Sequence, residues 1–88
     1  MKYTDTCKIH IEESISISGF NYLYIFGKHI NGGFICLPGW NIACEASALP
    51  YSEDYNKDRL AKAGLPEKVA SAIANRIGEY IDKEYSND

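Results

Sequence analysis

The residues able to do metal or thiol chemistry are few: three cysteines and two histidines. Cys7 and His10 have a C-x-x-H spacing, but side chains three residues apart on a strand face opposite sides, so both cannot reach one ion. Cys36 and Cys44 lack the paired spacing of a structural zinc site. We therefore expect no metal and no other cofactor.

The one histidine–cysteine pair that a hairpin would bring near each other is His29 and Cys36. The expected strand pairs, His29 with Phe34 and Gly27 with Cys36, place the two diagonally, and no third group is positioned to orient the histidine. The sequence also lacks the phosphate-binding, dinucleotide-binding, serine-hydrolase and zinc-protease motifs. The prediction is a protein that is not an enzyme.

Side chains suited to binding gather around two expected turns. Lys28 and His29 precede the first turn, and Trp40 and Asn41 follow the second, at Pro38-Gly39. Turns on a rigid sheet commonly hold binding groups, and tryptophan is favoured at interaction hot spots. Trp40 is either such a contact or a core anchor that fixes an edge strand to a helix.

Three further side chains complete the candidate binding set. Tyr22 and Tyr24 lie in the apolar run 20–26, which is either a central strand covered on both faces or an exposed aromatic face. Arg76 lies on the polar side of the expected last helix. Arg76, Lys28 and an aromatic side chain such as Trp40 are the groups that would hold a nucleotide.

The apolar spacing changes from that of strands to that of helices near residue 50. In the first segment, apolar residues alternate with polar ones up to Glu12-Glu13, and the alternation resumes at Ile15. This predicts either one long strand that bends or two short strands, and we favour two strands with a turn at Glu12-Glu13. Ser18-Gly19 supplies the next turn.

The clearest hairpin signal is Asn31-Gly32, which suits a two-residue type I′ turn and would pair Ile30 with Gly33. Pro38-Gly39 then interrupts the partner strand, because proline cannot donate to a strand ladder. Residues Trp40–Cys44 are expected to resume as a short edge strand.

Two helices follow. Ser52 is the expected N-cap of a helix from about Glu53 to Ala63, and a second helix runs from Pro66 to about Tyr85. On the second helix the apolar side chains form one arc and the polar ones another, with Glu84 as the exception. A row of small residues borders the apolar arc and packs either within the chain or across a dimer axis: Ala70, Ala74 and Gly78.

Together these patterns predict one α+β domain, residues 1–88, with an N-terminal antiparallel sheet of three to five strands, a short helix and a long amphipathic C-terminal helix packed on the sheet. The net charge of −3 and the lack of a basic face argue against direct binding to nucleic acid or an anionic membrane. No signal segment or membrane span is visible, and the odd number of cysteines suits free thiols, so we expect a cytoplasmic protein.

Residues Phe26–Trp40 (FGKHINGGFICLPGW), with Tyr55-Asn56 and Ala72-Ile73-Ala74, resemble small uncharacterised proteins carried by phages and mobile elements of Gram-positive bacteria. The resemblance covers most of residues 20–80. It implies a setting in which short, acidic, cytosolic proteins inhibit bacterial defence, anti-CRISPR proteins among them. A sheet followed by two helices is also similar in element order to phage proteins that sequester nucleotide immune signals.

The function favoured by these observations is inhibition of a host defence protein by protein–protein binding, because the chain lacks catalytic motifs and is rich in tyrosine, with seven. One alternative is a homodimer, formed through the C-terminal helix, that sequesters a nucleotide immune signal. Another is a structural or regulatory protein with no role in immunity.

Overall fold

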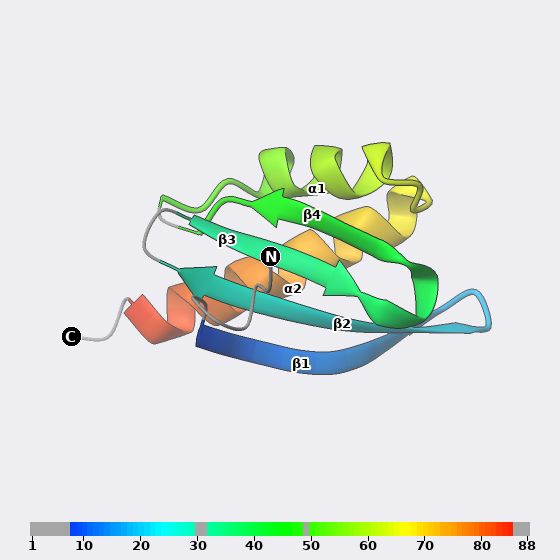
Figure 1. Ribbon diagram of the computed structural model, residues 1–88, viewed down its shortest axis with the longest axis horizontal. Coiled ribbons are helices and arrows are strands. Elements are labelled where there is room, and N and C mark those ends of the chain that lie inside the picture. Colours follow the sequence, from blue (N-terminus) through cyan, green and yellow to red (C-terminus); the bar gives the residue numbers. More distant parts are fainter. Residues whose placement is uncertain (1–7, 30–31, 49, 86–88) are drawn as a thin grey trace.

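The structure, a computed structural model, describes residues 8–29, 32–48 and 50–85. These residues form a four-stranded antiparallel sheet followed by two helices, which confirms the predicted α+β fold (Figure 1). The strands lie in chain order: β1 (Lys8–Ile17), β2 (Phe20–His29), β3 (Gly32–Leu37) and β4 (Ile42–Ala46). Two helices follow: α1 (Glu53–Lys62), which lies along β4 at the top of Figure 1, and α2 (Glu67–Tyr85), which crosses behind the sheet.

The first strand is continuous, so the predicted turn at Glu12-Glu13 is wrong. Glu13 occupies an inward position between Ile11 and Ile15, where a carboxylate would normally be unfavourable. Its Oε2 accepts a hydrogen bond from Tyr24 Oη at 2.5 Å and lies 2.8 Å from Arg76 Nε. These two partners compensate the charge, and the strand passes through Glu13 without a turn.

The β1–β2 connection is the predicted two-residue turn. Ser18 and Gly19 have φ values of 54° and 84°, and Ile17 pairs with Phe20 on either side of them. Two successive positive φ angles define a type I′ turn, whose twist matches that of the flanking strands.

A bulge near the start of β1 changes the orientation of His10. The β1–β2 register shifts between Ile9 and Ile11, which leaves His10 as the extra residue. The His10 ring lies 6.4 Å from the Phe26 ring and 5.9 Å from the Tyr80 ring, centroid to centroid. The alternation in the sequence predicts an outward His10, and the bulge turns it toward α2 instead.

The helices cover the face of β2 that bears Tyr22 and Tyr24, so the exposed aromatic face that was one of the two predictions is wrong. Tyr22 and Tyr24 are 5% and 0% exposed, which excludes them from an exposed aromatic face. On the opposite face Leu23 is 42% exposed, whereas Phe34, which lies over Gly27, is 4% exposed, so that face is open near Leu23 and closed near Gly27. Both helices contribute to the core on the side of Tyr22 and Tyr24, α1 through Leu60 and α2 through Ile73.

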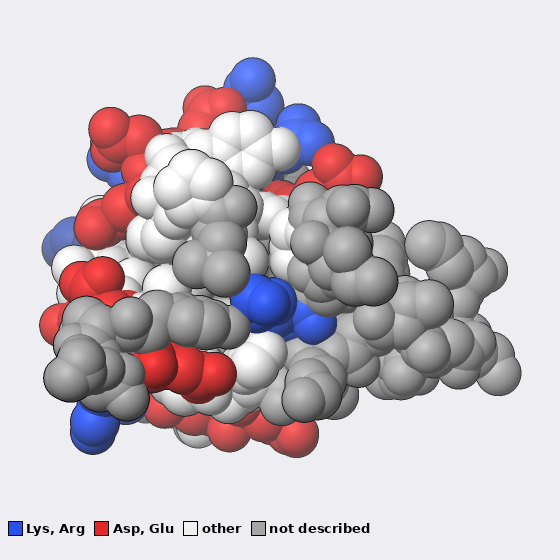
Figure 2. Space-filling view, turned by 90° about the vertical axis from the view of Figure 1, so that its left-hand side faces the viewer, with Lys and Arg blue, Asp and Glu red and all other residues white. Residues whose placement is uncertain are grey.

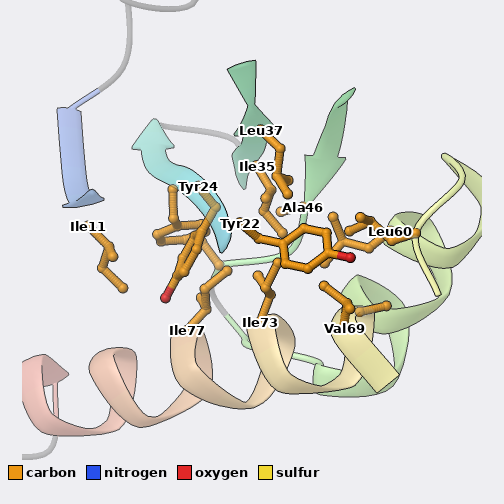
Figure 3. Close-up of a cluster of buried hydrophobic side chains, with 14 of the residues drawn as sticks. Ile11, Tyr22, Tyr24, Ile35, Leu37, Ala46, Leu60, Val69, Ile73 and Ile77 are labelled. Atoms are coloured by element: carbon orange, nitrogen blue, oxygen red, sulfur yellow. The ribbon is translucent and has the colours of Figure 1, made fainter. Parts of the chain in front are cut away.

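The core lies between that covered face and the helices. Figure 3 shows Val69, Ile73 and Ile77 of α2 directed at the sheet, with the rings of Tyr22 and Tyr24 above them. The apolar arc predicted for the second helix is therefore confirmed. Its buried members are Val69, Ala70, Ile73, Ala74, Ile77 and Ile81.

The β2–β3 hairpin is present, but its turn differs from the prediction. Gly32 pairs with His29 and Gly33 with Lys28, so the loop consists of residues 30 and 31 rather than Asn31-Gly32. Those two loop residues lie outside the described part of the chain. The register is shifted by two residues, which leaves every side chain on its predicted face because the side-chain period of a strand is two.

Steric fit between glycine and phenylalanine explains the shifted register. Gly27 lies opposite Phe34 rather than Cys36, and a Cβ added to Gly27 would stand 2.3 Å from Phe34 Cε1. A Cβ on Gly33 would lie 3.2 Å from Phe26 Cε1. Each glycine thus leaves room for an aromatic ring to cross the neighbouring strand.

The last strand is an edge strand, as predicted, and begins two residues later than expected. Ile42 and Cys44 of β4 pair with Leu37 and Ile35 on the covered face, and Ala43 is exposed on the open face. Pro38–Trp40 forms a 3₁₀ turn between β3 and β4.

The helix ends match their predicted signals. The Ser52 hydroxyl accepts the Tyr55 N–H at 3.2 Å, and Gly64 after α1 has a φ of 120°. Neither α1 nor α2 combines the length and the apolar character that a membrane-spanning helix requires.

The row of small residues on α2 is covered within the chain. The Tyr51 hydroxyl donates to the Ala74 carbonyl, and a Cβ added to Gly78 would stand 2.9 Å from Tyr51 Cε2. Ala70 and Ala74 are fully buried. This row therefore supports packing within the chain and offers no surface for a second helix across a dimer axis.

Candidate binding surface

Three aromatic side chains meet at one end of the sheet, where the β1–β2 turn and the Pro38–Trp40 turn come together (right-hand side of Figure 1). We call Phe20, Tyr22 and Trp40 the aromatic corner. The Trp40 ring stacks on Tyr22, with centroids 4.6 Å apart and planes 20° apart. Phe20 meets Trp40 edge-on at 6.2 Å and 83°. These are favourable aromatic arrangements, so the three rings form one unit.

The outer two rings of the aromatic corner face solvent. Phe20 is 58% exposed and Trp40 is 41% exposed, whereas Tyr22 is buried beneath them. The indole Nε1 of Trp40 donates to the Asn21 carbonyl at 3.3 Å, which fixes the orientation of the ring. Trp40 is thus a surface residue held on a buried tyrosine, which excludes the core-anchor alternative.

Local backbone geometry places Trp40 over β2. Pro38 begins the 3₁₀ turn, and Asn41 ends it in the left-handed conformation with a φ of 57°, its N–H donating to the Pro38 carbonyl at 3.3 Å. Asparagine tolerates this conformation better than most residues. Asn41 is exposed beside Trp40, so these two predicted site residues do share a surface.

The strand segments that carry the aromatic corner contain few charged residues. From Ser14 to Cys44 the sequence contains one charged residue, Lys28, although 24% of the whole chain is charged. Pro38 and Gly39, next to Trp40 in the 3₁₀ turn, add exposed apolar or small groups at this end of the sheet. This long uncharged stretch, together with Phe20, is the sequence signal for the surface that motif reasoning missed.

Lys28 and His29 lie at the other end of β2. Six residues separate Lys28 from Tyr22, which corresponds to about 20 Å along a strand. Lys28 is half-buried, and the side chain of His29 lies outside the described atoms. Figure 2 shows the end of the molecule away from the aromatic corner, where acidic and basic side chains intermingle. The predicted cluster of Lys28, His29, Trp40 and Asn41 is therefore divided between two ends of the sheet.

Arg76 is engaged by carboxylates of its own chain. Its Nε and Nη2 lie 2.8 and 3.5 Å from the two oxygens of Glu13, and its Nη1 lies 3.3 Å from Glu79. The hydrogen bond and charge of Glu13 raise the pKa of Arg76. Burial, together with Glu13, raises the pKa of Tyr24. Arg76 is already paired with Glu13 and Glu79, and Lys28 lies at the other end of the sheet from Trp40. The described residues therefore do not assemble the predicted nucleotide site.

Two other polar features lie on the helices: a contact of His10 with α2, and a groove between α1 and α2. His10 Nδ1 lies 3.4 Å from Tyr80 Oη and 3.7 Å from Glu84 Oε2. Glu84, the exception in the apolar arc of α2, therefore has a partner on β1. An open groove of about 610 Å³ separates α1 and α2, and the Lys57–Glu67 ion pair (3.2 Å) lies in it. The groove has both signs of charge and no concentration of reactive groups.

The described thiols are not arranged for chemistry. Cys36 and Cys44 are free and half-buried, and burial raises the pKa of both thiols. Cys36 lies on the open face and Cys44 on the covered face, and Cys7 lies outside the described residues. Within residues 8–29, 32–48 and 50–85, no three His, Cys, Asp or Glu side chains form a metal-ligand group.

Comparisons with known proteins identify the family of the chain. Neither a search of the curated proteins nor a search of the solved structures returned a match. A family model described as a family of unknown function, DUF6618, matches residues 1–85. Because this match spans nearly the whole sequence, the chain belongs to the DUF6618 family.

Proposed function

We propose that this protein is a non-enzymatic binding protein and that a partner protein docks on the aromatic corner. The observation that carries the proposal is the state of Trp40, which is fixed by stacking on Tyr22 yet 41% exposed beside a 58% exposed Phe20. A rigid aromatic side chain loses little conformational freedom on binding, so its contact area contributes to affinity.

The low charge of the segments that carry the aromatic corner supports a protein partner. Interface cores are depleted of charged residues and enriched in aromatic ones, and hot spots lie where water is excluded. The segments that bear Phe20, Tyr22 and Trp40 lie within Ser14–Cys44, where the one charged residue, Lys28, is at the other end of β2. In the setting that the sequence resemblance implies, the partner is a host defence protein, and the bound complex is its inhibited form.

The test combines affinity capture with a matched set of variants. Wild-type protein is used to isolate a partner from the host, and its affinity is then measured for Trp40→Ala, Phe20→Ala and Tyr55→Ala. Tyr55 is the control because it is an equally exposed aromatic residue, 42%, on α1. We expect Trp40→Ala to weaken binding roughly 30-fold or more, the effect of a hot spot of about 2 kcal/mol, and Tyr55→Ala to leave it unchanged.

The single tryptophan supplies an independent readout. Covering a half-exposed indole shifts its fluorescence to shorter wavelength, so titration with the partner should shift the Trp40 emission. The proposal fails if no partner binds at micromolar concentration, or if a partner binds equally to the Trp40 and Phe20 variants. A thermal-shift panel of cyclic and ADP-ribose-type nucleotides tests the nucleotide alternative, and we expect an unchanged melting temperature.

A further inference from the structure

The outer edge of β1 is a long strand edge with no strand beside it among the described residues. Within the described part of the chain, β1 pairs with β2 on one side and with no strand on the other, and it borders the sheet in Figure 1. It is ten residues long, whereas the opposite edge strand, β4, has five. From Ile11 to Ile17 it contains no proline, glycine or lysine, the residues that commonly prevent edge-to-edge association. Two other protective features are a bulge and an inward charge. On β1 the bulge at His10 precedes this segment, and the charge of Glu13 is paired with Arg76.

The β1–β2 turn determines which backbone groups face outward. Ile17 and Phe20 flank a two-residue turn, and such a flanking pair exchanges both backbone hydrogen bonds. Because these bonds alternate along an antiparallel pair, Ile15 and Glu13 also direct their N–H and C=O groups at β2. The residues that direct these groups to the free edge are Glu12, Ser14 and Ser16.

We propose that β1 pairs antiparallel with β1 of a second copy of this chain, about a two-fold axis at Ser14. The two sheets then form one continuous eight-stranded sheet. Ser14 faces the partner's Ser14, and Glu12 faces the partner's Ser16, so all outward backbone groups of the segment find partners. An edge that pairs with itself needs this kind of self-complementary register.

Charge is compatible with this register. The two Glu12 side chains would be about 14 Å apart along the strands, at 3.4 Å per residue, which exceeds the screening length of about 8 Å at physiological ionic strength. Glu13 is already paired with Arg76 at 2.8 Å in its own chain. A register centred on Glu13 would instead place two carboxylates directly opposite each other, which is unfavourable.

Apolar contacts favour the same register. Ile15 and Ile17 lie on the covered face of β1 but are only half-buried, because β1 is at the margin of the sheet. In the dimer, Ile17 lies opposite the partner's Ile11, and Ile15 lies opposite the partner's Glu13, with the partner's Ile11 and the partner's Ile15 as its diagonal neighbours. Cross-strand pairs of branched side chains stabilise antiparallel sheets, so these residues gain the neighbours that a single chain does not provide.

The pairing has a consequence for binding but does not rest on the proposed function. The strands run in opposite directions, so the two aromatic corners lie at opposite ends of the joined sheet. Ser18 and its symmetry mate are eight residues apart along the strands, or roughly 27 Å. The dimer would present two binding surfaces, whereas a failure of partner binding would leave the dimer itself unaffected.

The test is the molar mass in solution, measured by light scattering and sedimentation at sub-millimolar concentration. Wild-type protein is expected to have the mass of two chains. Ser14→Lys and Ser14→Glu each place like charges at the two-fold axis and should be monomeric, and an equimolar mixture of the two should restore the dimer. Ala43→Lys, at an exposed position on the β4 edge, is the control and should stay dimeric.

Folding of each variant is checked by circular dichroism, and the exposed position of Ser14 predicts an unchanged spectrum. A monomeric wild-type protein would overturn the proposal. So would a Ser14→Lys variant that stays dimeric, or a dimer that Ala43→Lys dissociates and Ser14→Lys does not.

Discussion

Asn56 provides the sharpest test of how the helices are attached to the sheet. It is the buried polar residue of the described chain, with an exposed fraction of 0%. Its Oδ1 accepts the Ser47 N–H at 2.7 Å, and its Nδ2 donates to the Ser47 carbonyl at 3.1 Å. Replacing Asn56 with alanine leaves the Ser47 N–H and C=O, on the segment that leads from β4 into α1, without these two hydrogen bonds.

The expected cost follows from these two hydrogen bonds. Each net contribution is about 1 to 1.5 kcal/mol when the groups left behind are partly reached by water, and Ser47 is half-buried. Asn56→Ala should therefore lower the free energy of unfolding by about 2 to 3 kcal/mol. A domain of this length has roughly 4 to 13 kcal/mol in total, so the loss is a substantial share.

Equilibrium unfolding in urea measures this change. With a slope of about 1 kcal/mol per molar urea for so small a chain, the midpoint should fall by about 2 M or more. Asn75→Ala is the matched control, because Asn75 is exposed on α2, and its effect should stay within about 0.5 kcal/mol. If Asn56→Ala is as stable as the control, water replaces the amide at Ser47 and the reasoning is refuted.

Three further outcomes are expected. Gly27→Ala should destabilise the fold by about 1 to 3 kcal/mol, since its Cβ would stand 2.3 Å from Phe34 Cε1; urea unfolding would show no change if the ring can move aside. Burial raises the pKa of Tyr51 to about 12 from 10.0. The stability that the protonated Tyr51 hydroxyl contributes is therefore complete below pH 10 and is lost as the pH rises through 12. Melting temperatures across this range should fall less for Tyr51→Phe than for wild type. In a Cys7→Ser variant, the thiols of Cys36 and Cys44 should react with a disulfide reagent much more slowly in native protein than in urea. The reason is that burial raises the pKa of both thiols. Equal reaction rates in native protein and in urea would contradict their burial.

Residue spacing predicted the elements whose signals are local. The Ser52 cap, the Gly64 terminus and the apolar arc of α2 depend on side chains within a few residues of one another, and the structure confirms each. The Ser18-Gly19 turn is predicted for the same reason. These features need no knowledge of what the element packs against.

Predictions that depend on distant partners were the ones that failed. Glu13 interrupts an apolar row and resembles a turn residue until Arg76, 63 positions later, supplies its partner. The β2–β3 register depends on a ring that crosses Gly27, which turn preference alone does not include. His10 is displaced by a bulge that the alternation of apolar residues does not show.

The exposure of the candidate binding residues was predictable in part for similar reasons. Trp40 and Asn41 follow a proline–glycine turn, and turn residues tend to be exposed, so both were found. For Tyr22 and Tyr24 the sequence left both a covered and an open face possible, because periodicity tells which side chains share a face but not which face the helices cover. Phe20 was missed because a strand residue next to a turn has no pattern that marks it as exposed.

The residues that carry the sequence resemblance now divide by role. Gly27 accommodates Phe34, Asn56 holds the Ser47 backbone, and Ala74 lies beneath Tyr51, so these residues maintain the fold. Within the quoted motif, Trp40 is the large apolar side chain that faces solvent. A search for function within the family should therefore begin at Trp40.

The order of elements along the chain has a consequence for synthesis. The sheet is a meander of neighbouring hairpins, so it can form as the chain leaves the ribosome, but its covered face requires α2, the last described element. Until Val69, Ile73 and Ile77 emerge, the nascent sheet exposes an apolar face with almost no charge to keep it soluble. Chains that terminate before α2 should therefore be captured by chaperones or degraded, and the cell would accumulate this protein only as complete chains.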